Sequence, residues 1–351
     1  MTGPKLSATR ATKSSTIALV GVGVLLLGLA AVPLWSDTDV ERLMIDIFLY
    51  AALAALWNFL AGFAGLVSVG QQAYVGIGGY GLIALSAKAG VPPLYCVPIM
   101  GLIAAAFAVP VAGVVFRLRG AYFAIGSWVV AEVLRLSAKL ITPLGGGSGM
   151  SLPVRVLTSV GRRPADRFAV EYWVSLALLI AILGAIFLTL RSRLGLALTA
   201  IRDNELAARS SGVSVARTKL IVYVVAAAGA AMVGALIFLQ KLRITSDSAF
   251  SVNDWTALVI FMVVIGGIGT FEGPIIGTLV FFALRETLSD LGPFYLIALG
   301  AVAIGVMLIE PKGVWGFVRK RWRAQLLPLQ LRVIGAGDAE ATRPQATGHR
   351  T

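Results

Sequence analysis

The chain has 351 residues, of which 58% are apolar and only 13% are charged, and its mean hydropathy is +0.87. Soluble domains carry about a quarter charged residues, so this composition excludes soluble, disordered, fibrous and disulfide-scaffold proteins. The apolar runs are continuous rather than alternating, which argues against a membrane β-barrel. The sequence therefore predicts an all-α fold, a polytopic transmembrane helix bundle.

A span needs about 20 mostly apolar residues to cross the hydrocarbon core. About ten candidates (eight to ten) meet this need, the eighth and ninth being short and separated by glycines. In chain order they are Ile17–Trp35, Met44–Leu60, Leu66–Ala87, Leu94–Phe116, Ala121–Leu140, Tyr172–Leu190, Leu220–Gln240, Trp255–Ile268, Pro274–Leu288 and Phe294–Ile309. This division predicts a leader at 1–16, a transmembrane domain at 17–311 containing a polar loop at 191–219, and a basic tail at 312–351.

Basic residues orient this arrangement. The net charge is +13, and nineteen Lys and Arg residues fall on the side of both termini against eight on the other side. Cytoplasmic loops are enriched in Lys and Arg, so we expect a multi-pass protein of a prokaryotic inner membrane with both termini in the cytoplasm. The same rule explains the positive charge without a nucleic-acid partner. The main exception is the cluster Arg155–Arg167, in the longest external loop.

A glycine-rich stretch at 62–81 contains Gly76, Gly78 and Gly81 in a G-x-G-x-x-G pattern. No βαβ unit surrounds it, so a dinucleotide site is rejected. The glycines permit close helix packing, or they interrupt a helix that lines a transport path, where Ser68, Gln71 and Gln72 would offer polar atoms. The sequence supports both interpretations about equally.

The fifth predicted span carries Glu132, Arg135 and Lys139 on one helical face. Each charge at the membrane centre would cost about 2.5–3.5 kcal/mol, so this face should point into the bundle or a wet cavity. A structural Glu132–Arg135 pair, with Lys139 extending to the interface, is slightly favoured over substrate contact.

The loop at 191–219 is too polar to span a membrane. Gly195 and Gly212 bracket a predicted helical stretch in which Arg202, Glu205 and Arg209 share one face. Glu205 precedes Arg209 by four residues, the favourable order for a helical ion pair. This stretch is either a solvated loop helix, which the physical pattern alone favours, or a docking helix that a cytoplasmic partner moves.

A second glycine-rich stretch spans 266–277. Close packing explains its glycines, which are Gly266, Gly267, Gly269, Gly273 and Gly277. The break between the two spans needs hydrogen-bond partners for its backbone, either inside the protein or in a wet cavity.

Several chemistries are excluded by what the sequence lacks. The chain has one cysteine, Cys96, and one histidine, His349, so an intrachain disulfide, a His/Cys metal cluster and a Ser-His-Asp triad cannot form. No G-x-x-x-x-G-K-[ST] motif occurs. We therefore expect no catalytic residue, no metal and no cofactor in this chain, and no P-loop nucleotide site.

Four runs of sequence carry a resemblance to a known family. They are GLVSVGQQAYVGIGGYG, RLRGAYFAIGSWVVAEVLR, SRLGLALTAIRDNELAARSSGVSVARTKL and VVIGGIGTFEGPIIG. In order and form they resemble the LivM-type permease subunits of ABC importers for branched-chain amino acids, over about Asn58 to Gly316. The AIRDNE-x-A-A stretch is the most specific part.

The resemblance implies a role for each matching position. The ATPase-coupling loop would include Ala200, Arg202, Asp203, Glu205, Ala208 and Gly212. The transport path would include Ser68, Gly70, Gln71, Gly76, Tyr80, Tyr122, Glu132 and Arg135. Gln71 stands where many relatives have histidine, which leaves no titrating group there.

The resemblance also implies partners. They are a sister permease that forms a heterodimer with this chain, two cytoplasmic ABC ATPase subunits that hydrolyse the ATP, an extracytoplasmic substrate-binding protein and membrane lipid. The expected function is import of leucine, isoleucine, valine or similar amino acids. Two alternatives stay open: the same class of permease carrying urea or short amides, and a secondary transporter or channel that works without ATPases.

Overall fold

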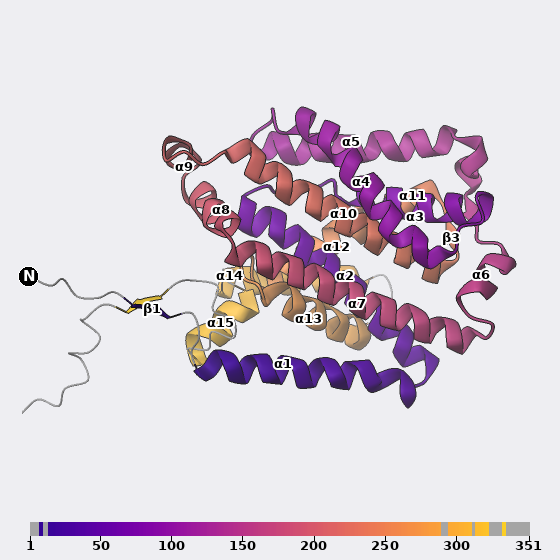
Figure 1. Cartoon of the computed structure of the whole chain (residues 1–351), viewed down its shortest axis with the longest axis horizontal. Helices are drawn as coiled ribbons and strands as arrows, with labels where there is room; N and C mark the ends of the chain where they lie inside the picture. Colours follow the sequence, from indigo (N-terminus) through magenta and orange to yellow (C-terminus); the bar gives the residue numbers. More distant parts are fainter. Residues whose placement is uncertain (1–6, 10–12, 289–293, 311–312, 323–331, 335–351) are drawn as a thin grey trace, which may run out of the picture.

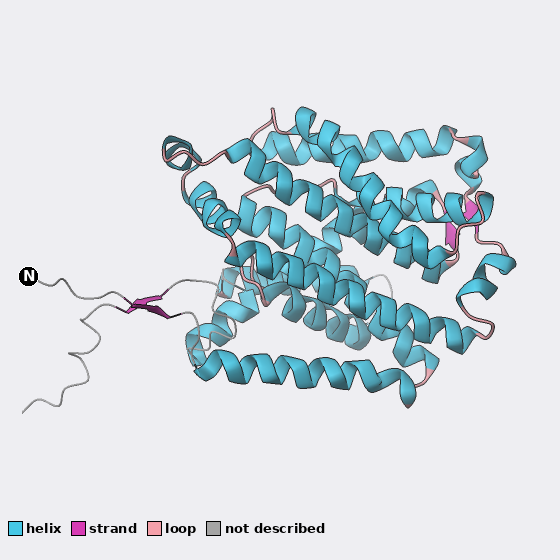
Figure 2. Cartoon of the chain, viewed as in Figure 1, coloured by secondary structure: helices cyan, strands magenta, loops and turns pink. Residues whose placement is uncertain are grey.

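The computed structural model describes residues 7–9, 13–288, 294–310, 313–322 and 332–334. Almost all of this part of the chain is helical (Figure 2). The helices are α1 (Lys13–Ala31), α2 (Thr38–Asn58), α3 (Gln71–Lys88), α4 (Pro93–Val115), α5 (Ala121–Leu140), α6 (Val154–Val160), α7 (Pro164–Arg191), α8 (Arg193–Asp203), α9 (Glu205–Ser210), α10 (Val215–Lys241), α11 (Ser246–Ala249), α12 (Leu258–Gly266), α13 (Gly273–Leu288), α14 (Tyr295–Ile309) and α15 (Gly313–Trp322). The expected all-α class is confirmed.

The strands are short and form two antiparallel pairs. β1 (Ser7–Thr9) pairs with β4 (Arg332–Ile334), and β2 (Met150–Ser151) pairs with β3 (Arg243–Ile244). Of the predicted leader and tail, residues 1–6, 10–12, 312, 323–331 and 335–351 lie outside the described part of the chain.

Seven described segments are long and apolar enough to cross a membrane. The span predicted at 66–87 is the shorter helix α3, of 18 residues, because the chain before it is not helical, and the span predicted at 274–288 is α13, of 16 residues, which begins one residue earlier. The span predicted to begin at Trp255 starts earlier, since α11, a π-helical turn (Asn253–Ala257) and α12 form one apolar segment over 246–266. The expected number of about ten spans is therefore approximate.

The core lies around α10, which packs against α3, α4 and α2. About two thirds of its most apolar stretch is buried, against 22% for the corresponding stretches of α5 and α7. Small residues bring α3 and α10 together: a Cβ on Gly78 would lie 1.9 Å from the carbonyl oxygen of Ala231, and one on Gly234 would lie 2.2 Å from that of Val75. Such backbone-to-backbone contact is typical of packing between membrane helices.

The bundle has two distinct ends (Figure 1). β1, α8, α9 and α15 lie at one end, which we call the α9 end, and α6, α11 and β3 lie at the opposite end, the α6 end. The N-terminal strand thus lies at the same end as the polar segment 191–219. α15, which opens the predicted tail, packs on α12 and α13.

Candidate functional site

The polar segment 191–219 forms two short helices rather than the single helix that the sequence predicts. α8 ends and α9 begins at Asn204, whose side-chain Oδ1 accepts a hydrogen bond from the backbone N–H of Ala207 at 3.0 Å. Asparagine is favoured at this capping position because it satisfies a backbone donor that the helix leaves free. The prediction of one continuous helix is wrong because this cap starts a new helix.

The break also changes how the charged residues are grouped. Arg202 does not share a face with Glu205 and Arg209; its Nε lies 3.4 Å from Oδ1 of Asp203. The predicted Glu205–Arg209 pair does form, at 3.6 Å. Glu205 also accepts a hydrogen bond from Nζ of Lys219 on α10, at 2.7 Å.

These contacts hold α9 against α10. The pKa of the Glu205 carboxyl lies below its ordinary value near 4.5, chiefly because Lys219 donates this hydrogen bond, with the charges of Lys219, Arg209 and Arg119 adding to the effect. Ala208 of α9 also packs with Ile201 and Val215 in a small apolar cluster of its own. Gly212, with φ +84, ends the turn that leads into α10.

One side of α8 faces the bundle, and the other faces solvent. Leu198 and Ile201 are buried, and Gly195 lies so close to α7 that a Cβ there would be 1.9 Å from the carbonyl oxygen of Leu190. Asp203 and Glu205 are exposed, whereas Ala200 is partly buried. The segment therefore packs against the bundle through α8 and exposes a polar surface to solvent.

Arg202 links α8 to the second glycine-rich stretch. Its Nη1 lies 3.8 Å from the position that a Cβ on Gly269 would occupy, and α8 also contacts the π-helical turn at Phe59–Phe63. Gly269 has φ +74, a conformation that favours glycine. A movement of α8 would therefore shift Arg202 relative to the Gly269 loop.

The first glycine-rich stretch contains a true interruption of the helix. After the π-helical turn the chain is non-helical up to Gly70, and α3 begins only at Gln71. The free backbone groups find partners inside the protein, as they must at membrane depth: Trp57 Nε1 donates to the carbonyl of Ser68 at 2.8 Å, and the N–H of Val69 donates to Oγ of Ser127 at 3.0 Å. The predicted interruption is present.

The two glycine-rich stretches meet each other. Asn58 on α2 accepts a hydrogen bond from the N–H of Gly269 at 2.8 Å and donates one to the carbonyl of Thr270 at 2.7 Å. A Cβ on Gly62 would lie 2.6 Å from the backbone nitrogen of Gly269. The interruptions that flank α3 and α13 are thus joined through one buried amide side chain.

The other glycines of the second stretch serve close packing. A Cβ on Gly277 would lie 1.7 Å from the carbonyl oxygen of Met262, and one on Gly266 would lie 1.9 Å from that of Gly273. Gly267, with φ +124, ends α12. These contacts agree with the packing interpretation of the sequence.

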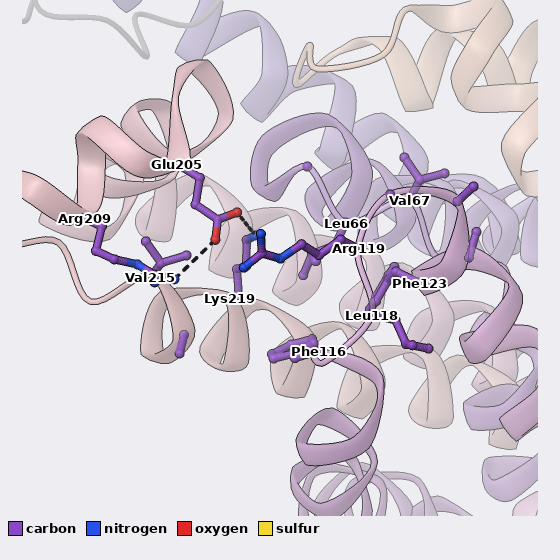
Figure 3. A pocket seen from close by; sticks show the side chains of 15 residues that line it. Leu66, Val67, Phe116, Leu118, Arg119, Phe123, Glu205, Arg209, Val215 and Lys219 are labelled. Carbon is purple, nitrogen blue, oxygen red and sulfur yellow. Dashed lines mark hydrogen bonds and ion pairs between the residues drawn. The ribbon is translucent and has the colours of Figure 1, made fainter.

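A pocket of about 510 Å³ lies beside the first interruption (Figure 3). Its walls are the non-helical residues 65–67, the loop and helix start at 116–124, α9 and the beginning of α10. Arg119 reaches toward the Glu205 carboxylate, which pairs with Arg209 and Lys219 (Figure 3). The pocket therefore joins the helix interruption to α9 and carries more positive than negative charge.

The predicted path residues fall into two groups. Ser68, Gly70, Gln71, Gly76 and Tyr80 are buried. Gln71 Nε2 donates to the carbonyl of Leu53 at 3.0 Å, and a Cβ on Gly76 would lie 2.3 Å from the ring of Phe250. In the chain alone these positions are packed rather than open, so their assignment to the path stays a prediction.

The second group lies on the exposed face of α5. Tyr122 is 73% exposed, and Glu132 and Arg135 are partly exposed. The predicted Glu132–Arg135 pair forms, with Nε 2.9 Å from Oε2. Lys139 does not extend away from it as expected; its Nζ lies 2.9 Å from Oδ1 of Asp247 on α11, which also pairs with Arg135.

Sequence reasoning missed Asn58, Ser127, Lys219 and Asp247. Asp247 could have been sought, since Glu132 leaves one cation on the α5 face unbalanced. The contacts of Asn58 and Ser127 join residues 211 and 58 positions apart, and Lys219 reaches Glu205 across 14 positions; nothing in the local sequence marks these contacts.

Comparison with known proteins agrees with this architecture. Residues 40–310 match the family described as "Branched-chain amino acid transport system / permease component". The chain is 30% identical over 306 residues to the high-affinity branched-chain amino acid transport system permease protein LivM of Escherichia coli, covering 80% of this chain and 72% of that protein. The LivM protein of Salmonella typhimurium is 29% identical over the same shares.

More distant relatives cover less of the chain or are less similar. A probable LivM of Methanocaldococcus jannaschii is 26% identical, over 75% of this chain and 84% of that protein. The xylose transport system permease XylH of Escherichia coli is 31% identical, over 32% of this chain and 30% of that protein. No solved structure is significantly similar to this chain. The match over 40–310 shows that the chain belongs to the family of branched-chain amino acid transport system permease components.

Proposed function

We propose that this chain forms half of the membrane path of an ATP-driven importer for branched-chain amino acids, and that α8 and α9 are the segment on which the ATPase subunits act. The partners would be a sister permease, two cytoplasmic ATPases and an extracytoplasmic substrate-binding protein. The sequence carries no P-loop motif, which supports ATP hydrolysis by separate subunits.

The observation that carries this proposal is the closeness of Arg202 to the Gly269 loop. α8 packs against the bundle, presents a polar surface to solvent, and brings Arg202 beside the loop that Asn58 joins to the first interruption. Coupling requires an element that a partner can move between two states and that changes the path when it moves. Helix interruptions are the softest part of a bundle, so a displaced α8 would act on them first.

The exposed face of α5 supports a second permease as partner. This face runs from the pocket beside Gly120 to the charged residues near its other end. Charges at membrane depth face protein or water rather than lipid. A sister permease covering α5 would enclose the path between the two subunits.

The excess of basic residues supports an orientation. The α9 end holds the polar segment 191–219 and α15, both of which are rich in Lys and Arg, together with the N-terminal strand. Under the positive-inside rule the α9 end would face the cytoplasm of a prokaryotic cell, where ATPase subunits could reach α8 and α9.

Replacing Arg202 or Glu205 by alanine tests the coupling role. In the assembled importer, R202A and E205A are expected to lower ATP-driven leucine uptake by about tenfold or more, because the contact to the glycine loop or the tether to α10 is lost. R217A is the matched control, since Arg217 is an exposed arginine at the same end, on α10. Uptake and ATP hydrolysis are measured together in vesicles.

Unchanged uptake and unchanged stimulation of ATP hydrolysis in both variants would overturn the coupling assignment.

Competition in the same vesicles tests the substrate. Excess valine or isoleucine is expected to suppress leucine uptake, whereas suppression by urea or short amides would assign the chain to that substrate class.

A further inference from the structure

Four charged side chains join α5 to α11 at the α6 end. Arg135 pairs with Glu132, with Nε 2.9 Å from Oε2, and with Asp247. Lys139 also pairs with Asp247, at 2.9 Å. The group, which we call the α5–α11 charge cluster, holds two cations and two carboxylates.

The cluster lies on an open face of this chain. The side chain of Asp247 is 66% exposed, that of Glu132 is 41% exposed, and that of Lys139 is 35% exposed. Glu132 stands eight residues before the end of α5, or about 12 Å along the helix at 1.5 Å per residue. Exposed charges at such depth require water or protein in front of them rather than lipid.

A buried hydroxyl lies next to the cluster without a partner. Tyr80 is 5% exposed, its ring stacks on Phe250 with centroids 6.0 Å apart, and its hydroxyl makes no hydrogen bond. Tyr80 lies on α3, which packs against α11, the helix that carries Asp247. Buried polar groups are almost always satisfied, and this hydroxyl has no hydrogen-bond partner among the described residues, so a ligand that reaches it would satisfy it.

Apolar side chains accompany the cluster on α5. Val129 and Leu136 are each about half exposed, and their positions three residues before and four residues after Glu132 place them on the same side of the helix. An aliphatic surface therefore adjoins paired positive and negative groups.

We infer that the α5–α11 charge cluster binds the zwitterionic head of an aliphatic α-amino acid on its way through the permease. The ligand carboxylate meets Arg135 and Lys139, its ammonium meets Asp247 and Glu132, and its side chain lies on Val129 and Leu136. The ligand replaces ion pairs that already exist, so no charge is left uncompensated in the path. This inference rests on the proposed function and names the place where the substrate is held.

Saturation-transfer NMR on the permease–ATPase assembly in lipid nanodiscs, without the binding protein, tests the site. The probes are leucine, 3-methylbutylamine, which lacks the carboxylate, and 4-methylpentanoate, which lacks the ammonium. Leucine is expected to show the strongest transfer, because it alone satisfies both charges. D247N is expected to reduce the leucine signal at least threefold and to leave that of 4-methylpentanoate unchanged.

R155Q is the matched control, since Arg155 is an exposed charge of the same end outside the cluster. Asp247 is itself exposed, so D247N is expected to assemble normally; K139Q, which should weaken the carboxylate contact, gives a second readout. Equal transfer from all three probes, or an unchanged leucine signal in D247N and K139Q, would overturn the site. The coupling role is judged separately, by ATP-driven uptake in the wild-type importer.

Discussion

Glycine positions show most clearly what single residues do in this bundle. The G-x-G-x-x-G pattern serves packing at Gly76 and Gly78, where the ring of Phe250 and the backbone of α10 leave no room for a Cβ. The sequence could predict that small residues there permit close approach, because the chemistry of glycine is local. It could not predict which helix approaches, because Ala231 lies more than 150 residues away in the chain.

Replacing Gly78 by alanine is expected to lower the free energy of unfolding by about 1–3 kcal/mol, as overpacking does. A Cβ there would lie 1.9 Å from a backbone oxygen, which no side-chain rotation relieves. The matched control is G184A on α7, where a Cβ would meet nothing within 4 Å. The melting temperature of the detergent-solubilised protein measures both, and an equal effect of the two variants would contradict this packing.

At the scale of elements, some helix boundaries are set by local sequence signals, and others are set by tertiary contacts. An asparagine cap before Glu205 and a glycine after α9 are local signals, so the division into α8 and α9 could have been recognised from sequence. The interruption before α3 was predicted, but its boundaries were not. They depend on Trp57 and Ser127, and the joint between the two interruptions depends on Asn58 and Gly269, 211 residues apart.

The tether of α9 to α10 should depend on pH. Because the folded pKa of Glu205 is lowered, its contribution is fully present above the ordinary carboxyl pKa near 4.5 and is lost as pH falls through the lowered value. Hydrogen–deuterium exchange over residues 205–210, corrected for intrinsic rates, is expected to stay constant from pH 7 to 5 and to rise below pH 4.5.

In E205Q the exchange should be faster at neutral pH and should lack this rise. An identical pH profile in the wild type and E205Q would show that Glu205 does not hold α9. The carboxylate is well exposed, so the effect is expected to be local to α9 rather than a loss of the whole fold.

At the scale of the whole molecule, composition alone was enough to predict a polytopic helical bundle. The long apolar helices α2, α4, α5, α7 and α10 lie close to where hydropathy places them, because their length is set by membrane thickness. The number of spans was less well predicted, since α3 is shortened by a break that tertiary contacts determine and α13 has only 16 residues. The charged residues of α5 were found from sequence, whereas their partner Asp247 required the fold.

The two ends of the molecule have different roles in the proposed function. The α9 end carries the segment that separate subunits would move, and the α6 end carries the charge cluster where a substrate would enter. The path between them follows the interrupted helix and the face of α5. This chain would then supply the path but no energy source.

Uptake of labelled leucine into vesicles tests these roles most directly. The assembled importer, with its sister permease, ATPases and binding protein, is compared with the same vesicles lacking only the ATPase subunits under an imposed ion gradient. We expect uptake only with the ATPases and ATP present. Equal uptake without the ATPases, driven by the gradient alone, would contradict the coupling role of α8 and α9.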